Sequence, residues 1–370
     1  MLLLMVVIMI ILTVIYSLLA VSLAGLLVRY AHKIRLIQAP AQTAELADIK
    51  DLPTVSVCIP ARNEMYTLSG CLDRVLQGDY PKLEILVLDD ESDDDTSLLI
   101  KSYAHAGVRF IPGQKLPKDW LGKNFALDCL LRSASGEYVV FMDVDTRIDY
   151  QTISKAIATM EGSSSHLLSS LPHRSDTGRL STIFGTLRYF WTLLFAVNEV
   201  TPASSSFWVV NRRSLLEMDG LVKYRLDSYP EMSLQSTLGM GMLVDSFDLG
   251  VSFEKRLSSQ ADTGIRLLKP LLAGYGIFVW LGLLLTAALP VVLVWSVLAS
   301  GWYLAIVTAL AITLAWVQLD LFYKLQWSSR HWYSLFVGPF VVLHEAYLLS
   351  MSYYRHAVGH VDWKGRRVKL

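Results

Sequence analysis

The stretch GEYVVFMDVDT (residues 136–146) decides the fold class of this chain of 370 residues. Its apolar run has the length and composition of a buried strand, and it leads directly into Asp143 and Asp145. In extended backbone, residues two positions apart point the same way, so both carboxylates would face one ligand. Such a pair suits one Mn²⁺ or Mg²⁺ that also binds substrate phosphates. We therefore predict a divalent metal site at Asp143 and Asp145, with solvated loop acids as the alternative.

The segments before this stretch repeat an alternation of strand and helix. Strands are predicted at residues 54–60, 82–90 and 108–111, and helices at residues 93–104 and 121–131. Apolar strands alternating with helices indicate an α/β fold with a mostly parallel sheet that is covered on both faces. Ligands of such sheets bind beyond the carboxyl ends of the strands, and the acidic clusters of this chain fall there.

Polar residues at two further strand ends predict a nucleotide site. Asp90 ends the second strand, where a carboxylate can accept from the N3–H of uracil, while the acids after it cap the next helix. Glu64 follows Arg62 and Asn63 at the end of the first strand and is placed to accept from a ribose hydroxyl. A local ion pair between Arg62 and Glu64 is the alternative.

The composition limits the class of protein. Hydrophobic residues make up 53% of the chain, the mean hydropathy is +0.41, and the apolar residues concentrate at both ends. Lys+Arg and Asp+Glu are equal at 33 each, so no basic field indicates a nucleic-acid partner. Cys58, Cys71 and Cys129 lack metal or disulfide spacing, which suits a reducing compartment.

The charge and hydropathy pattern predicts a multi-pass protein of the cell membrane with a cytoplasmic catalytic domain. A basic flank at residues 29–35 follows the first apolar stretch, so the amino end should face outward. The predicted parts are an anchor at 1–28, a basic juxtamembrane linker at 29–52, a cytoplasmic domain at 53–265, a membrane region of three apolar stretches at 266–354, and a basic tail at 355–370.

Three crossings after the domain would place the basic tail outside, against the same charge rule. The last apolar stretch, with Pro339 inside it, is therefore the candidate that does not cross simply. His344 and Glu345 in that stretch either line an acceptor path or lie near an interface.

Residues 180–200 are apolar and aromatic, with Arg188 as the sole charge before Glu199. We predict an interfacial helix beside the active site, where a lipid acceptor enters from the bilayer. A buried core helix is the alternative.

Six segments of the chain stand out as motifs. They are IPARNE (59–64), LDDESDDDT (88–96), Gly122-Lys123, FMDVDT (141–146), SSFWVVNRRSLLEMDG (205–220) and the tail VDWKGRRVKL (361–370). In this order they resemble the family 2 glycosyltransferases with the type A fold. The tail is similar to that of a membrane-anchored branch with carotenoid- and hopanoid-associated transferases, related to ceramide glucosyltransferases.

The resemblance implies an inverting, metal-dependent transfer of a sugar from a nucleotide diphosphate donor, expected to be a UDP-sugar, to a membrane lipid. It implies Mn²⁺ or Mg²⁺ as cofactor, and the donor, the lipid acceptor and the bilayer as partners; it names no protein partner. The donor residues it implies are Ala61, Arg62, Glu64, Asp90, Lys123 and Asp143, and the metal ligands are Asp143 and Asp145.

The family places a Glu-Asp pair that supplies the base at a fixed distance after the glycine of the cleft helix. Eleven residues after Gly220 stands Glu231, which we take as the base, with Asp227 in reserve. The Q-x-x-R-W motif is missing; its nearest candidates are Arg256, or Gln260 with Arg266, and its absence disfavours processive synthesis. A non-catalytic membrane scaffold that keeps the nucleotide-sugar fold stays open. Transfer to a polyprenyl phosphate also stays open, although it needs more cationic residues near the acceptor site than the sequence identifies.

Overall fold

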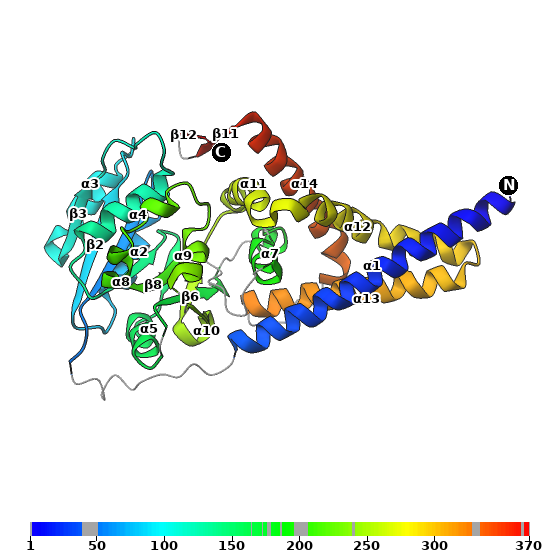
Figure 1. The fold of residues 1–370 in the computed structure, drawn as a ribbon, viewed down its shortest axis with the longest axis horizontal. Coiled ribbons are helices and arrows are strands. Elements are labelled where there is room, and N and C mark those ends of the chain that lie inside the picture. Colours follow the sequence, from blue (N-terminus) through cyan, green and yellow to red (C-terminus); the bar gives the residue numbers. More distant parts are fainter. Residues whose placement is uncertain are drawn as a thin grey trace.

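The computed structural model describes residues 2–38, 51–163, 165–171, 173–175, 179–185, 187–195, 206–238, 241–327, 334–363 and 366–369. Within these residues the chain has two parts, an α/β domain and a group of long helices that extend away from it (Figure 1). The N-terminus lies at the far end of the long helices.

A mixed sheet in the order β3-β2-β1-β4-β8-β6-β9 forms the centre of the domain. The pairs among β3, β2, β1 and β4 are parallel, β8 is antiparallel to both of its neighbours, and β6 and β9 are parallel. The predicted α/β fold with a mostly parallel sheet is confirmed. The strands are β1 (Val55–Ala61), β2 (Leu83–Asp89), β3 (Val108–Pro112), β4 (Tyr138–Met142), β6 (Leu167–Leu171), β8 (Phe207–Asn211) and β9 (Gly241–Asp245).

Helices cover both faces of this sheet because successive strand residues point to opposite sides. In β1, Val57 and Ile59 pack with α2 (Leu68–Leu76), α3 (Thr96–Ser102) and α5 (Thr152–Glu161). Cys58 of the same strand packs on the other face. That face carries α4 (Gly122–Ser133), α8 (Arg212–Glu217) and α9 (Pro230–Leu238).

The predicted fourth strand is shorter than we expected. β4 ends at Met142, and residues 143–146 form a turn in which the Thr146 amide donates to the Asp143 carbonyl at 3.0 Å. The prediction that Asp143 and Asp145 share extended backbone is therefore wrong. The turn is held by the Ser206 carbonyl, which accepts from the Asp143 amide at 2.9 Å and from the Thr146 hydroxyl at 2.8 Å.

A small second sheet starts where that turn ends. It has the order β5-β10-β7, with β5 (Thr146–Ile148), β10 (Val251–Phe253) and β7 (His173–Arg174). The remaining short elements are η2 (Tyr103–Ala106), η3 (Val222–Tyr224), α10 (Ser246–Leu249) and η4 (Ala273–Tyr275).

Five longer helices account for most of the remaining described chain. They are α1 (Leu2–Ile37), α11 (Leu257–Leu272), α12 (Gly276–Leu298), α13 (Trp302–Trp327) and α14 (Ser334–Val358). Among the described residues, α1, α12 and α13 are long and apolar enough to cross a membrane, and α14 is not among them.

After the α/β domain, the chain runs outward along α12, away from the domain, and returns toward it along α13 (Figure 1). The turn between α12 and α13 lies near the N-terminus, where a Cβ on Gly301 would come 2.2 Å from the side chain of Met9. α13 then runs back, and the hairpin of β11 (His360–Trp363) and β12 (Arg366–Lys369) lies toward the domain (Figure 1).

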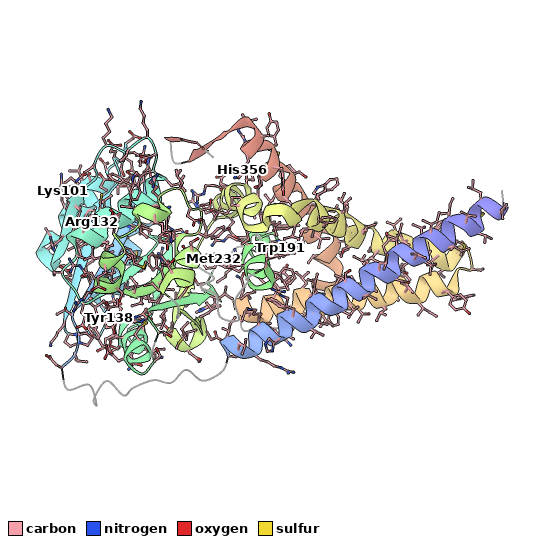
Figure 2. All side chains as sticks on the ribbon, in the orientation of Figure 1. Lys101, Arg132, Tyr138, Trp191, Met232 and His356 are labelled. Atoms are coloured by element: carbon pink, nitrogen blue, oxygen red, sulfur yellow. The ribbon has the colours of Figure 1, made fainter. Side chains whose placement is uncertain are left out.

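Residues 179–195 form two short helices at the junction of the two parts, α6 (Arg179–Ile183) and α7 (Arg188–Phe195) (Figure 1). Arg188 to Leu194 are all buried within the protein, and the location of this helix at a membrane interface stays a prediction. Residues 196–200 of the predicted helix lie outside the described residues. Figure 2 shows Trp191 at this junction.

Partners far away in sequence bury α7. The carboxylate of Glu345 in α14 accepts from the Leu187 amide at 3.1 Å and from the Trp191 indole at 2.8 Å. His344, the neighbouring residue, packs against Phe184 with ring centroids 5.6 Å apart. Glu345 thus has a structural role that the sequence did not indicate.

Candidate active site

The ends of β1 and β2 are fastened together by Arg62. Its buried guanidinium donates to the carbonyl oxygens of Asp90 and Glu91, the latter at 2.7 Å, and lies 3.6 Å from the Asp93 carboxylate. The Asp90 amide donates to the Ala61 carbonyl at 2.8 Å. The structure therefore brings Ala61, Arg62 and Asp90 together, with Arg62 bracing the two loops.

Neighbouring acids are engaged in local turns. The Thr67 hydroxyl donates to the Glu64 carboxylate at 2.9 Å, just before α2. Asp89 accepts from the Ser97 hydroxyl in α3, so this acid of the pair is bound to the helix. Glu64 remains beside this end of the sheet, because its amide donates to the Thr96 hydroxyl at 2.8 Å.

Gly113, at the end of β3, closes one side of this region and was missed by the sequence reasoning. A Cβ there would lie 2.3 Å from the Asp89 carbonyl and 3.1 Å from the Asp90 Cα. Only glycine fits so near the backbone. No local sequence pattern indicates this contact, because the contact depends on the pairing of β2 with β3.

The two metal-candidate aspartates each pair with a lysine. The Lys123 ammonium lies 2.6 Å from Asp143, and the Lys255 ammonium lies 3.1 Å from Asp145. Lys255 reaches Asp145 because the Glu254 amide donates to the Asp145 carbonyl at 3.0 Å, beyond the end of β10. Lys255 was also missed, since nothing in its local sequence indicates this partner.

This donor set fits a hard divalent cation that a substrate completes. The Asp143 and Asp145 side chains are 27% and 20% exposed, so both are accessible to a ligand. In the described part of the chain, no group of three His, Cys, Asp or Glu side chains comes together to hold a metal by itself. Mg²⁺ and related ions commonly take one or two carboxylates and fill their other positions with water and phosphate oxygens.

Glu231, in the first turn of α9, is fully buried. Neither of its carboxylate oxygens has a hydrogen-bond partner within the described residues. Burial raises its pKa to about 7, and Asp143 adds to the rise, while Lys123 and Arg188 act in the opposite direction. Glu231 therefore lies within electrostatic reach of the lysine and the aspartate at the metal candidate.

Asp227, the reserve candidate, lies in the loop before α9. Its carboxylate accepts a hydrogen bond from the Ser233 hydroxyl of that helix and one from the Tyr229 amide at 3.5 Å. Asp227 is thus tied to the segment that carries Glu231.

Asn124 joins the two halves of the site and was not predicted. Its buried side-chain amide donates to the carbonyls of Tyr224 at 2.9 Å and Asp227 at 2.8 Å. Because Lys123 is the preceding residue, one helix end supports both the lysine at Asp143 and the loop before Glu231.

Two arginines act electrostatically on this region. Arg188 of α7 is buried and opposes the rise in the pKa of Glu231, and the pKa of Arg266 is lowered by burial and then by the Arg188 charge. Gln260 is buried and donates to the Lys255 carbonyl at 2.9 Å, whereas Arg256 is exposed. Of the residues nearest to the missing motif, Gln260 and Arg266 thus lie toward the site.

The architecture is shared with a solved glycosyltransferase. The mannosyltransferase PcManGT from Pyrobaculum calidifontis, in complex with GDP-Man and Mn²⁺, superposes with a TM-score of 0.56 at 17% identity, over 92% of this chain and 99% of that one. The α/β domain has the type A glycosyltransferase fold.

Sequence comparison identifies the domain more closely. Residues 56–217 match the model of Glycosyl transferase family 2, so this part of the chain is a family 2 glycosyltransferase domain. An N-acetylglucosaminyltransferase of Rhizobium meliloti is 32% identical over 149 residues, which is 40% of this chain and 34% of that protein. GalNAc(5)-diNAcBac-PP-undecaprenol beta-1,3-glucosyltransferase of Campylobacter jejuni is 30% identical over 30% of this chain and 34% of its own length. The chain spans about a third of the length of the curated relatives it matches.

Proposed function

We propose that this protein transfers a sugar, with inversion, from a nucleotide diphosphate donor to a lipid acceptor, with Mn²⁺ or Mg²⁺ as cofactor and a UDP-sugar as donor. One observation carries the proposal: the Glu231 carboxylate is buried and has no hydrogen-bond partner in the described chain. It lies within electrostatic reach of Lys123 and Asp143. A pKa of about 7 suits a general base that works near neutral pH. The complex of PcManGT with GDP-Man and Mn²⁺ supports a nucleotide diphosphate sugar as the class of donor and Mn²⁺ as the metal, whereas uridine as the nucleoside is inferred from Asp90.

The residues divide the chemical work as follows. Glu231 takes the proton of the acceptor hydroxyl as its oxygen bonds to the anomeric carbon. The bond from that carbon to the phosphate oxygen breaks, and its electron pair stays on the nucleoside diphosphate. Lys123 stabilises that charge, which is greater in the transition state than in the ground state. A divalent cation bound at Asp143 and Asp145 would supply further neutralisation of the leaving group.

We also propose that the catalytic domain is cytoplasmic in a multi-pass protein of the cell membrane. Arg29 and Lys33 follow the apolar part of α1, which favours the cytoplasm for that end. If α12 and α13 cross and return, the basic tail lies on the same side as the domain. This arrangement removes the conflict that three crossings would create.

A lipid phosphate is the second candidate for the acceptor. Arg188 and Arg266 near Glu231 favour it, because paired arginines suit phosphate oxygens. The name of the Campylobacter jejuni relative includes a glycan linked to diphospho-undecaprenol, so it supports a lipid-linked acceptor but not the phosphate as the group that receives the sugar. Phosphatase treatment of the lipid extract separates the two candidates, because only a phosphate acceptor is then lost.

The test is release of uridine diphosphate by the purified full chain with Mn²⁺, a UDP-sugar and a membrane lipid extract. We expect lipid-dependent release that is lost in Asp145→Ala and kept in Asp248→Ala, an exposed aspartate on α10. Binding of uridine diphosphate without turnover would instead make the protein a scaffold. Absence of both binding and release would refute the assignment of the site.

A further inference from the structure

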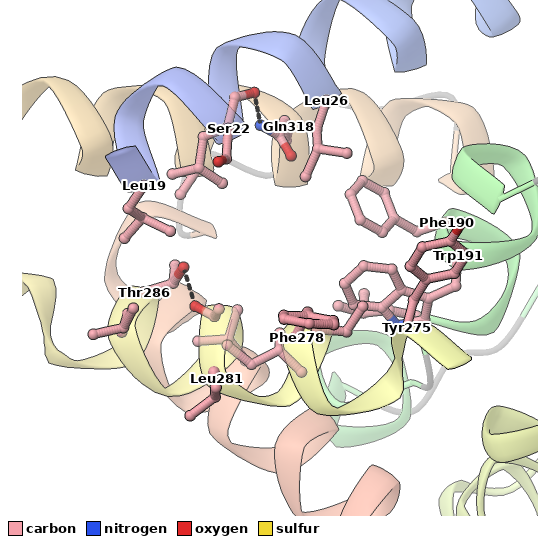
Figure 3. A pocket seen from close by; sticks show the side chains of 18 of the residues that line it. Leu19, Ser22, Leu26, Phe190, Trp191, Tyr275, Phe278, Leu281, Thr286 and Gln318 are labelled. Atoms are coloured by element: carbon pink, nitrogen blue, oxygen red, sulfur yellow. Dashed lines mark hydrogen bonds between the residues drawn. The ribbon is translucent and has the colours of Figure 1, made fainter. Parts of the chain in front are cut away.

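A cavity of about 540 Å³ lies among the long helices, beside α7. Figure 3 shows aromatic side chains of α7 and the start of α12 at one end, and Leu19 of α1 with Thr286 of α12 at the other. The lining residues include Leu19, Leu23, Phe190, Trp191, Phe278 and Leu319.

The cavity offers little to water or a polar ligand, because polar side chains in its wall are already used inside the protein. Apolar cavities stay dry and take apolar guests. The Ser22 hydroxyl donates to the Leu18 carbonyl at 2.8 Å, and the Thr286 hydroxyl donates to the Gly282 carbonyl at 2.7 Å. The Gln318 amide donates to the Leu23 carbonyl at 2.7 Å, and the Trp191 indole donates to the Glu345 carboxylate at 2.8 Å.

The cavity is open on the side that would face lipid. Leu18 and Phe278 line it and are nevertheless 65% and 70% exposed. They belong to α1 and α12, two of the helices long and apolar enough to cross a membrane. A guest can therefore enter sideways from a bilayer without passing through water.

The size of the cavity suits one hydrocarbon chain. An apolar cavity of about 150 Å³ holds a benzene ring, so about 540 Å³ has room for roughly twenty carbon atoms. This is the length of one long alkyl chain or a few isoprene units, and less than a whole membrane lipid with two chains.

α7 connects this cavity to the site of transfer. Phe190 and Trp191 line the cavity, and Arg188, on the same helix, acts on the Glu231 carboxylate. Arg188 and Trp191 are three residues apart, so they lie about 4.5 Å apart along the axis and are neighbours on the surface of α7. An amphiphile whose chain fills the aromatic end of the cavity would thus hold its polar end close to Glu231.

We propose that this cavity binds the hydrocarbon chain of the lipid acceptor and so orients its polar end toward Glu231. The inference rests on the proposed function and adds to it a place for the acceptor. Contacts of the hydrocarbon chain with α1, α7 and α12 would then determine whether long-chain acceptors bind better than short-chain acceptors.

Filling the cavity tests the proposal. A Cβ on Gly282 meets no atom within 4 Å, so Gly282→Phe can place its ring in the cavity. Gly25→Phe is the matched control, because Gly25 is equally unobstructed on α1 but does not line the cavity. Phe278→Ala is a second variant, and it removes a side chain that is 70% exposed and contributes little to the buried core.

The full chain in detergent is assayed with Mn²⁺, a UDP-sugar and titrated membrane lipid extract. We expect KM for the extract to rise about tenfold or more in Gly282→Phe, and to rise in Phe278→Ala, with Gly25→Phe equal to the wild type. A photoreactive sixteen-carbon alcohol should label cavity residues, and extract that supports transfer should compete with it.

The results that contradict the cavity proposal differ from the result that contradicts the proposed function. Wild-type KM in Gly282→Phe, or labelling that active extract does not displace, overturns the proposal and makes the cavity a site for bulk bilayer lipid. If the wild type releases no uridine diphosphate under any condition, the proposed function fails, which the donor assay detects independently of the variants.

Discussion

Replacing Glu231 by Gln should slow transfer and, above neutral pH, stabilise the fold. The side chain is fully buried, and burial raises its pKa from 4.5 to about 7. Between these values the folded state keeps a proton that the unfolded state has lost, so the free energy of unfolding falls as pH rises from about 4.5 to about 7. The difference corresponds to about 3 kcal/mol, reached near pH 8 and absent near pH 4.5.

Glutamine has no such titration. We therefore expect the loss of stability from pH 5 to pH 8 to be smaller in Glu231→Gln than in the wild type by about 3 kcal/mol, seen as a smaller fall in Tm. Transfer should drop by roughly 10²–10⁴-fold, because the amide cannot take the proton of the acceptor. Thermal unfolding across that pH range and release of uridine diphosphate at pH 8 measure the two effects.

Glu137→Gln is the control, since Glu137 is exposed on the surface of the same domain. It should change neither the pH dependence of Tm nor the rate. Two results would contradict our reasoning about Glu231: a rate within tenfold of the wild type, or a fall in Tm between pH 5 and pH 8 as large as that of the wild type.

Four further predictions concern the same site. In the wild type, kcat/KM should rise about tenfold per pH unit below about 7 and then level off, as the pH–rate profile will test; a profile flat from pH 5.5 to 8 would exclude a base with this pKa. Asp145→Asn should abolish the response of donor turnover to Mn²⁺, measured by metal titration, and an unchanged response would remove Asp145 from the metal site. Lys255→Gln should bind Mn²⁺ alone several-fold more tightly, because the ammonium 3.1 Å from Asp145 repels the ion; weaker binding by electron paramagnetic resonance would contradict this. Asn124→Ala should lower kcat more than it raises the donor KM and destabilise the fold by about 1–3 kcal/mol, while a change confined to KM would exclude a positioning role.

Much of the domain could be predicted because its information is local. Runs of apolar residues of strand length predicted the ends of β1, β2 and β3 to within a residue or two. Because β1 and β2 are parallel, Ala61 and Asp89 pair directly at the ends of their strands, as expected from the fold class. Gly220, from which the position of Glu231 was counted, has a φ of +63°, which requires glycine or a strained residue, and the role of Glu231 as base stays a prediction.

The rest depends on contacts between distant segments. The turn after β4 is set by Ser206, 60 residues beyond Thr146, so the sequence around Asp143 continued to look like a strand. The packing of α7 could not be predicted because the elements that bury it come from both ends of the chain. Lys255 carries no local signal for its partner.

If the long helices lie in a bilayer, the anchorage of α7 by Glu345 makes the thickness of that bilayer a variable of the proposed reaction. Glu345 fixes the start of α7 to the helical bundle, whereas Glu231 belongs to the α/β domain. Helical bundles respond to hydrophobic mismatch by tilting. Tilt would move Arg188 relative to the base, so the rate in reconstituted vesicles should pass through an optimum as the acyl chains of the host lipid are lengthened.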